Sequence, residues 1–431
     1  MDLRRRLMAN NVGSALSTLL TSGQTFYAPF ADKGSGEVSL IASGAGASQA
    51  ATFTRATTAT TVNSAGLIVS VASGTPRSYY DPTTLQYLGY LAEGARTNLC
   101  LQSADLATSW TPVRASVGVN QVASPDGSVN ADKLIEDSTA ANSHYIQAAS
   151  ISIANTTAYT FSAFVKPAGR SFIAVQGDIS GGFLGGASGF SLSGAGSVVG
   201  LGAGVSSATI VSYPNGWYRI TVTATSSGIT ASPGVALRTS SGTAIESYNG
   251  DGTSGVYLWG AQLEAGAFAS SYIPTTTASV TRNADVLTYP FSGNADATVG
   301  TAYAEVSTLW TTLGTAQSII DFADRSALVV DNAASTTIRI SDGTNAALKT
   351  GLTSMVTGIR KRASSWGGAG LLVTGDGASP ATATFDGNMG STAIGIGING
   401  SGSARPWFGT ICNVRIYQTQ LSSAQLQAVT A

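Results

Sequence analysis

The stretch Ala158-Tyr159-Thr160-Phe161-Ser162-Ala163-Phe164-Val165-Lys166 decides the fold class of this chain. Apolar and polar side chains alternate along it, and a period of two predicts a half-buried β-strand. Asn155 and Pro167 bound the stretch as turn residues do. One face carries Tyr159, Phe161, Ala163 and Val165, and the opposite face carries Thr160, Ser162, Phe164 and Lys166.

Two further stretches extend the same pattern. Residues 216–223 place Tyr218, Ile220 and Val222 on one face, and Trp217, Arg219, Thr221 and Thr223 on the other. Residues 255–264 follow the turn Asn249-Gly250-Asp251-Gly252 and form a third predicted strand. Short strands separated by turns, without a helical period between them, predict a jelly-roll β-sandwich over residues 97–289.

Residues 290–431 repeat the all-β pattern and predict a second sandwich. In residues 410–417 the alternation places Cys412, Val414 and Ile416 on the core side. The chain then closes with a predicted short helix, because Ser422 and Gln425 form a capping box and Leu421 and Leu426 a hydrophobic staple.

The N-terminal part lacks this regularity. Residues 1–25 predict a short amphipathic helix with leucines spaced by fours, ended by Gly23. A signal peptide is the alternative, although residues 10–20 are polar for its apolar core. Residues 26–96 predict an irregular attachment or oligomerisation region. The expected attachment residues are Arg4, Arg5, Arg6, Leu7, Leu16 and Leu20.

Composition excludes several function classes. Only 10% of the 431 residues are charged, the net charge is −1, and Gly accounts for 51 residues. A nucleic-acid-binding protein would carry a basic footprint. With His144 as the single histidine and two cysteines, Cys100 and Cys412, most metal sites and nucleophilic triads are excluded by counting. The sequence contains no run of 18 apolar residues, the length that a membrane-spanning helix needs.

An ordered series of short motifs resembles the carbohydrate-binding-module-like jelly rolls of bacteriophage tail-fibre, head-fibre and other virion surface proteins. It begins at residues 91–99 (LAEGARTNL), continues through residues 216–219 (GWYR) and 258–264 (LWGAQLE), and ends at residues 271–275 (SYIPT). The resemblance covers residues 50–289, and the C-terminal part is similar to concanavalin-like or laminin-G-like sandwiches. It implies an oligomer, with a trimer favoured, exposed on a phage particle and binding host surface glycans.

Glycan recognition needs flat apolar rings for the C–H face of a sugar and polar groups for its hydroxyls. The glycan-binding candidates are Trp217, Tyr248, Trp366 and Trp110. Alternation places Trp217 opposite the core face of its strand, whereas Tyr248 and Trp366 lie in predicted loops. The alternative for each tryptophan is a place in a sandwich core.

No organic cofactor is expected. The resemblance favours a structural calcium ion, with Asp251 as its candidate ligand. The simpler interpretation of Asp251 is a turn residue. A glycan depolymerase would need two carboxylates about 5–10 Å apart, and no pair stands out because adjacent acids such as Glu136 and Asp137 point to opposite faces of a strand.

The sequence therefore predicts a non-enzymatic structural protein on the virion surface. Its N-terminal segment would bind other virion proteins, and its sandwiches would bind a host glycan. A secreted bacterial carbohydrate-binding protein or adhesin is the main alternative, and a depolymerase is the other.

Overall fold

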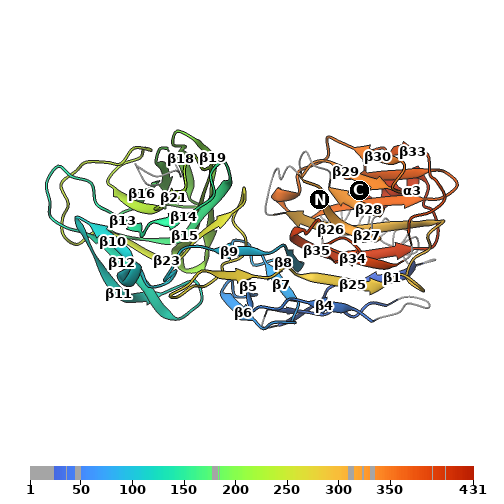
Figure 1. Ribbon diagram of the computed structural model, residues 1–431, viewed down its shortest axis with the longest axis horizontal. Coiled ribbons are helices and arrows are strands. Elements are labelled where there is room, and N and C mark those ends of the chain that lie inside the picture. The colour runs from blue at the N-terminus through green and yellow to red at the C-terminus, as the bar shows by residue number, and fades with distance from the viewer. Residues whose placement is uncertain are drawn as a thin grey trace, which may run out of the picture.

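The computed structural model describes residues 24–34, 36–43, 50–176, 183, 185–308, 315–322, 325–330, 335–390, 392–402 and 404–431. The protein is all-β, with two β-sandwiches side by side along its long axis (Figure 1). Most of the predicted N-terminal helix, with its attachment residues, lies outside the described residues. Gln24 already belongs to a strand.

One sandwich, here called the inserted sandwich, consists of two six-stranded antiparallel sheets. The first contains, in spatial order, β10 (Trp110–Val113), β13 (Tyr145–Ala148), β22 (Gly234–Arg238), β16 (Phe172–Gln176), β17 (Ser188–Ser191) and β18 (Ser197–Gly200). The second contains β11 (Ala115–Ala123), β12 (Val129–Glu136), β23 (Gly255–Ala265), β15 (Ala158–Ala168), β20 (Trp217–Thr225) and β19 (Val205–Tyr213). A small pair, β14 (Ile151–Ser152) with β21 (Thr230–Ala231), and two short helices, α2 (Leu106–Ser109) and η1 (Pro214–Gly216), complete it.

The core of the inserted sandwich follows the predicted alternation. On β15 the residues Tyr159, Phe161, Ala163 and Val165 are buried between the two sheets, together with Tyr218, Ile220 and Val222 of β20. Phe164 lies on the opposite face of its sheet, in a separate apolar cluster. The jelly-roll prediction for this part of the chain is confirmed at the level of a two-sheet β-sandwich.

The second sandwich, here called the composite sandwich, draws its strands from both ends of the described chain. Its ten-stranded sheet contains β2 (Asp32–Gly34), β3 (Glu37–Val38), β7 (Arg77–Tyr80), β8 (Tyr87–Glu93), β35 (Phe408–Tyr417), β26 (Gly300–Thr308), β31 (Arg360–Trp366), β32 (Leu371–Gly375) and β33 (Ala381–Ala383), with β1 (Gln24–Ala28) on β35. Its seven-stranded sheet contains β30 (Ala346–Lys349), β29 (Ile338–Ser341), β28 (Arg325–Val330), β27 (Gln317–Phe322), β34 (Ala393–Ile396), β25 (Val286–Pro290) and β4 (Thr52–Thr54). The short helix η2 (Met355–Thr357) precedes β31.

This arrangement corrects the expectation of an irregular attachment region over residues 26–96. Strands β1 and β8 both pair with β35, and β4 pairs with β25, so the N-terminal residues complete both sheets of the C-terminal sandwich. Phe26 and Tyr90 belong to its core. The expected boundary at residue 290 also shifts, because β25 starts at Val286 and pairs with β34. Backbone pairing with distant strands orders a segment whose own sequence is irregular.

Residue Cys412 corrects a second expectation. Val414 and Ile416 face the core as predicted, but Cys412 lies on the outer face, 3.8 Å from the Glu305 carboxylate. The register of β26 and β35 shifts between Tyr303 and Glu305, and Asn413 adopts a left-handed conformation with φ of 49°. This β-bulge inserts one residue and inverts the alternation on its N-terminal side.

The predicted terminal helix is confirmed. Helix α3 (Ser423–Thr430) begins with the expected capping box, in which the Ser422 hydroxyl accepts from the Gln425 backbone and the Gln425 side chain accepts from the Ser422 backbone. Leu421 and Leu426 pack together on the outer face of the ten-stranded sheet, beside Tyr303 and Leu372. No helix among the described residues is long and apolar enough to span a bilayer.

The chain passes between the sandwiches twice. It leaves the composite sandwich after β8 through β9 (Arg96–Asn98) and returns through β24 (Val280–Arg282), which pairs with β9. The inserted sandwich is therefore an insertion between two strands of the composite sandwich, held by two paired connections.

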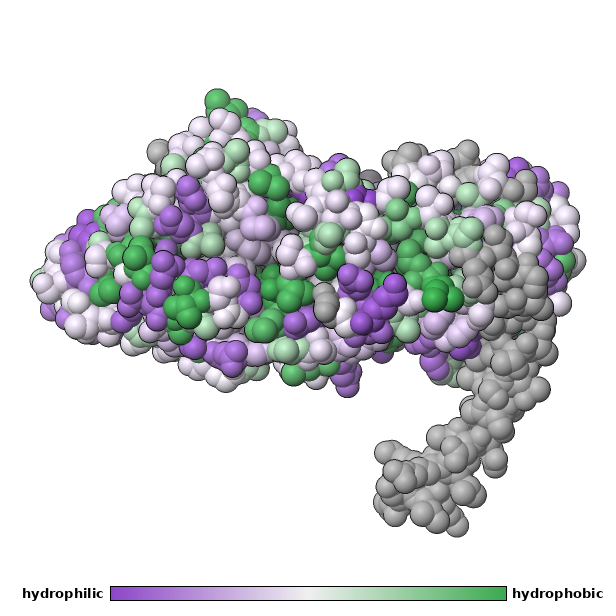
Figure 2. All heavy atoms as spheres, turned by 90° about the horizontal axis from the view of Figure 1, so that it is seen from below, coloured by the Kyte–Doolittle hydropathy of each residue, from purple (hydrophilic) through white to green (hydrophobic). Residues whose placement is uncertain are grey.

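A hairpin from the N-terminal part reaches back to the inserted sandwich. Strands β5 (Ala59–Val62) and β6 (Ile68–Val71) place Val62 and Ile68 against the outer face of the second sheet. The Ile68 backbone N–H also donates to the Pro125 carbonyl, at 2.9 Å. The face of the molecule that carries β4–β6 is continuous from one sandwich to the other, and its apolar residues form small scattered groups (Figure 2).

A cluster of buried charges lies where the two connections meet. Arg77 contacts the carboxylates of both Glu93, at 2.9 Å, and Asp285, and Arg55 donates to Asp285 at 2.9 Å. Arg282 lies 3.6 Å from Glu93 and 3.8 Å from Asp285. All five side chains are at most 1% exposed. We call these five residues the junction cluster; breaking a buried cluster of this kind typically costs about 3–5 kcal/mol.

The junction cluster predicts a specific pH dependence. Burial alone would raise the pKa of Glu93, but Arg282, Arg77 and the Ser271 hydrogen bonds lower it from 4.5 to about 2. Because the folded pKa is lowered, the stabilisation by Glu93 is present above pH 4.5 and is lost as the pH falls towards 2. We expect Glu93→Gln to unfold at lower urea concentration than wild type at pH 7, and the difference to shrink between pH 4.5 and 2.

The control is Glu37→Gln, because the Glu37 side chain is exposed on strand β3. A Glu93→Gln variant as stable as wild type at pH 7 would show that the cluster does not stabilise the junction.

Candidate functional site

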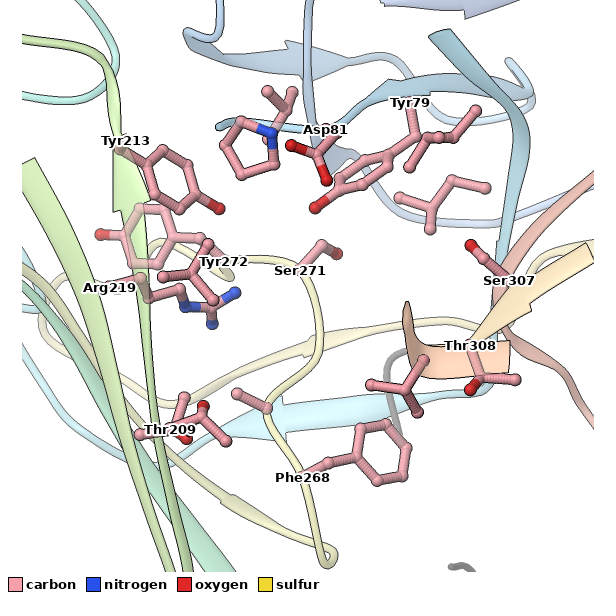
Figure 3. A pocket seen from close by; sticks show the side chains of 18 of the residues that line it. Tyr79, Asp81, Thr209, Tyr213, Arg219, Phe268, Ser271, Tyr272, Ser307 and Thr308 are labelled. Atoms are coloured by element: carbon pink, nitrogen blue, oxygen red, sulfur yellow. Dashed lines mark hydrogen bonds between the residues drawn. The ribbon is translucent and has the colours of Figure 1, made fainter. Parts of the chain in front are cut away.

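The two sandwiches face each other across a cleft of about 890 Å³, which we call the inter-sandwich cleft. Its volume lies near the upper end of the roughly 300–1,000 Å³ typical of small-molecule sites. Strands β7 and β8 and the loop of residues 267–272 contribute residues between the walls, and each sandwich contributes one wall (Figures 1 and 3).

The wall from the inserted sandwich is the outer face of β19 and β20. Alternation along β20 turns Thr221 and Thr223 to this face, and antiparallel pairing sets them opposite Thr209 and Ser207. The hydroxyls of Thr209 and Thr221 lie 2.6 Å apart. This face is therefore a flat array of short hydroxylated side chains, bordered by the exposed Val211.

Arg219 is the positive charge of this wall. Its Nη2 donates to Ser162 Oγ at 3.1 Å and to the Ser270 carbonyl at 2.8 Å, and its guanidinium lies 5.4 Å from the centre of the Phe164 ring. These contacts hold one edge of the group in place. The guanidinium faces the cleft (Figure 3) and also hydrogen-bonds the Tyr213 side chain, whereas its Nε is buried.

Tyr79 of β7 and Tyr213 at the end of β19 direct their hydroxyls towards the same space (Figure 3). Burial raises the pKa of both phenols, and the Arg219 charge offsets this only in part. Both hydroxyls therefore stay protonated near neutral pH and can donate as well as accept hydrogen bonds.

Asp81 supplies the negative charge of the cleft. Its Oδ1 accepts from the backbone N–H groups of Thr83, at 2.8 Å, and Thr84, at 2.7 Å, which makes a tight turn after β7. The Thr83 hydroxyl donates to the Ser212 carbonyl at 2.9 Å and fixes this turn to the inserted sandwich. Among the described residues that line the cleft, Asp81 is the single acid and Arg219 the single base.

The opposite wall belongs to the composite sandwich. Ser307 and Thr308 end β26, and Val356 of η2 lies nearby. The loop of residues 267–272 adds the largely buried rings of Phe268 and Tyr272 between the two walls. The cleft thus combines apolar surfaces with many hydroxyls, the two features that saccharide recognition requires.

The structure corrects the choice of Trp217 as an exposed sugar platform. Trp217 lies opposite the sandwich core, as its alternation predicts, but it is 1% exposed. Val62 and Ile68 of the β5–β6 hairpin belong to the apolar cluster around it, and its Nε1 donates to the Ala123 carbonyl at 3.1 Å. A ring enclosed in this way has no free face for a sugar.

Trp366 and Trp110 are also core residues rather than surface platforms. Trp366 ends strand β31 instead of lying in a loop; it is fully buried against Phe322, with ring centres 5.5 Å apart. Its Nε1 donates to the Asp296 carbonyl at 3.0 Å. Trp110 is 6% exposed and starts β10 in the core of the inserted sandwich.

Tyr248 and Asp251 come together at the far end of the inserted sandwich. The Tyr248 hydroxyl donates to Glu136 at 2.7 Å, and Arg170 binds the same carboxylate and lies 5.3 Å from the Tyr248 ring centre. Burial and the Glu136 hydrogen bond raise the pKa of Tyr248. The fully buried His144 ring packs against Tyr248 at an interplanar angle of 51°, with ring centres 4.7 Å apart. The Tyr248 ring is half-buried and its hydroxyl is already hydrogen-bonded to Glu136. Its role in glycan binding stays a prediction.

Asp251 acts as the turn residue that the sequence allowed. Its Oδ1 accepts from Thr253 N at 2.8 Å, Thr253 Oγ1 at 3.0 Å and Ser254 N at 2.7 Å, and these hydrogen bonds lower its pKa. Across the described part of the chain, no three His, Cys, Asp or Glu side chains are grouped as metal ligands. A calcium ion at Asp251 stays a prediction.

Sequence reasoning missed Tyr79, Asp81 and Tyr213 as site residues and placed Arg219 only on the polar face of its strand. The available signal was that polar face of β20. Nothing in the local sequence shows that residues 79–84 lie against it, because this proximity depends on the hairpin and the junction.

No protein-family profile matches the chain, and no curated protein does either. Among solved structures, Trypanosoma rangeli sialidase in complex with sialic acid superposes with a TM-score of 0.27 and 11% identity, over 70% of this chain. The chain spans 60% of the length of that sialidase. Domains LG4-5 of the mouse laminin alpha1 chain give a TM-score of 0.24 at 9% identity, over 67% of this chain and 89% of theirs.

The N-terminal CBM22-1-CBM22-2 tandem domain of Paenibacillus barcinonensis Xyn10C gives a TM-score of 0.22 at 11% identity, over 76% of this chain and 100% of that one. These superpositions are partial.

The burial of Trp217 leads to a stability prediction. We expect Trp217→Ala to lower the free energy of unfolding by about 3–5 kcal/mol, because it opens a cavity under the hairpin, and Trp217→Phe to cost less. Urea denaturation followed by circular dichroism measures both. The exposed Val211→Ala is the control, with an expected change within about 0.5 kcal/mol. A Trp217→Ala protein as stable as wild type would contradict the enclosed position of the ring.

Proposed function

We propose that this chain is a non-catalytic surface protein that binds a glycan in the inter-sandwich cleft. The observation that carries the proposal is the lining of the cleft: tyrosine and threonine hydroxyls, one carboxylate and one guanidinium beside apolar rings. Hydroxyls that donate and accept match the hydroxyls of a saccharide, and rings match its C–H faces. The site differs from the one expected from sequence, but the class of ligand is the same.

We further propose that the protein is displayed on a phage particle, as a tail-fibre, head-fibre or decoration protein. The motif series from residue 91 to residue 275 supports this, as does the charge content of 10%. A soluble monomer normally relies on surface charge to avoid association, and packing against other virion chains, in a trimer or a larger array, removes that need. The N-terminal segment with Arg4, Arg5 and Arg6 would attach it to the particle.

The glycan proposal is tested on the full chain, because the composite sandwich requires strands β1, β4 and β8 from the N-terminal part. We expect the protein to retain host-derived polysaccharide on a glycan array without releasing reducing ends from it. A steady release of reducing ends that disappears in Asp81→Asn would show a depolymerase instead. A lack of retention of any polysaccharide would contradict glycan binding.

The display proposal is tested with particles. A chain beginning at Gln24 keeps every described strand and should fold, but we expect it to be missing from purified particles when wild-type protein is present on them. Immunoblotting of particle and free fractions measures this. Incorporation equal to wild type would assign attachment to another surface, and secretion of the full chain by a bacterium without any particle would favour the adhesin alternative.

A further inference from the structure

We propose that the ligand of the inter-sandwich cleft is an extended, uncharged oligosaccharide held between Asp81 and Arg219. This inference rests on the proposed glycan-binding function and adds to it the class of saccharide and the residues that select it.

The charge balance of the cleft is the first argument. Asp81 and Arg219 are the two charged side chains in its described lining, and their charges cancel. They act on the same place, since both perturb the hydroxyls of Tyr79 and Tyr213, with opposite sign. A carboxylated or sulfated sugar placed against Arg219 would therefore also meet the Asp81 carboxylate, and such like-charge contacts are unfavourable. A neutral sugar meets no such opposition.

Hydrogen-bonding capacity is the second argument. Asp81 uses Oδ1 for the turn, and no described residue donates to its Oδ2, which is left as an acceptor for sugar hydroxyls. Arg219 is held through Nη2 by Ser162 and Ser270, its guanidinium also hydrogen-bonds the Tyr213 side chain, and the group faces the cleft. Between these two poles lie the hydroxyls of Tyr79 and Tyr213, which hydrogen-bond each other and keep further capacity to donate or accept (Figure 3). A ligand with several hydroxyls, which both donate and accept, matches the hydrogen-bonding capacity that these groups keep.

The extent of the cleft is the third argument. Its lining runs from Thr209 and Thr221 on the inserted sandwich to Thr308 and Val356 on the composite sandwich. A volume of 890 Å³ exceeds what a single sugar ring needs and lies near the top of the range for small-molecule sites. An oligosaccharide that spans the cleft touches both sandwiches at once, so affinity requires the two to keep the relative position that the junction cluster gives them.

Isothermal titration calorimetry of the full chain tests the inference. The probes are neutral hexasaccharides of the gluco-, manno-, galacto- and xylo-series, with hexagalacturonate and sialylated oligosaccharides as the acidic arm. We expect binding in the neutral arm, and each of Asp81→Asn and Arg219→Gln to weaken it by about tenfold or more, as expected for loss of a hydrogen bond to a charged group. Asp386→Asn is the matched control, because this acid lies on the composite sandwich away from the cleft lining and accepts from backbone N–H of Asn388 in a comparable turn.

Thermal unfolding of each variant separates loss of affinity from loss of fold, which matters for Arg219 because it also binds Ser162 and Ser270. Asp81→Asn keeps the shape of the side chain and is the more direct probe. Preference for the acidic arm, or neutral binding that is unchanged in folded Asp81→Asn and Arg219→Gln, would overturn this inference and leave glycan binding intact. Failure to bind in both arms would overturn the proposed function together with it.

Discussion

The position of Arg77 between Glu93 and Asp285 is the constraint on which the rest of the structure depends. Three arginines and two carboxylates are removed from water at the point where the chain leaves one sandwich and returns from the other. Each charge is costly to bury alone, so the cluster is favourable only when all the partners meet. Glu93 also accepts from the backbone and hydroxyl of Ser271, which ties the returning loop to the same point. Two sandwiches joined by flexible linkers would be free to separate, whereas this junction, the β5–β6 hairpin and the Thr83–Ser212 hydrogen bond tie the two together beside the cleft.

The motifs that carry the resemblance to virion surface proteins belong largely to this scaffold. Asn98 uses its side chain to bind the carbonyls of Ala261 and Ile273 and the N–H groups of Cys100 and Leu263. Glu264 is buried and holds Ser270. These residues connect the last strand of the inserted sandwich to its entry and exit segments. Of the residues proposed to contact sugar, Arg219 belongs to the motif of residues 216–219, whereas Tyr79, Asp81 and Tyr213 lie outside the series. Asn98 and Glu264 therefore help to join the two sandwiches, whereas most of the residues proposed to bind a ligand lie on the cleft walls.

Much of the fold could be predicted because it depends on neighbours in sequence. Alternation on β15 and β20 identified the core faces correctly, and the capping box at Ser422 located the final helix. Cys412 was misplaced because a bulge at Asn413 breaks the period of two, and no residue type signals a bulge reliably. Trp217 was assigned to the correct face but to the wrong environment, because the hairpin that covers it comes from residues 59–71.

By itself, the sequence determined the all-β class, the strand faces and the absence of strong charge, since these follow from periodicity and composition. Tertiary structure alone decided that strands β1, β4, β7 and β8 complete the C-terminal sandwich, that Trp110, Trp217 and Trp366 are buried, and that Tyr79 and Asp81 face Arg219. The physical reason is that β-pairing and burial of charge join segments about 200 residues apart, such as Arg77 and Asp285. A local pattern shows which face of a strand is polar, but it carries no information about what lies against that face.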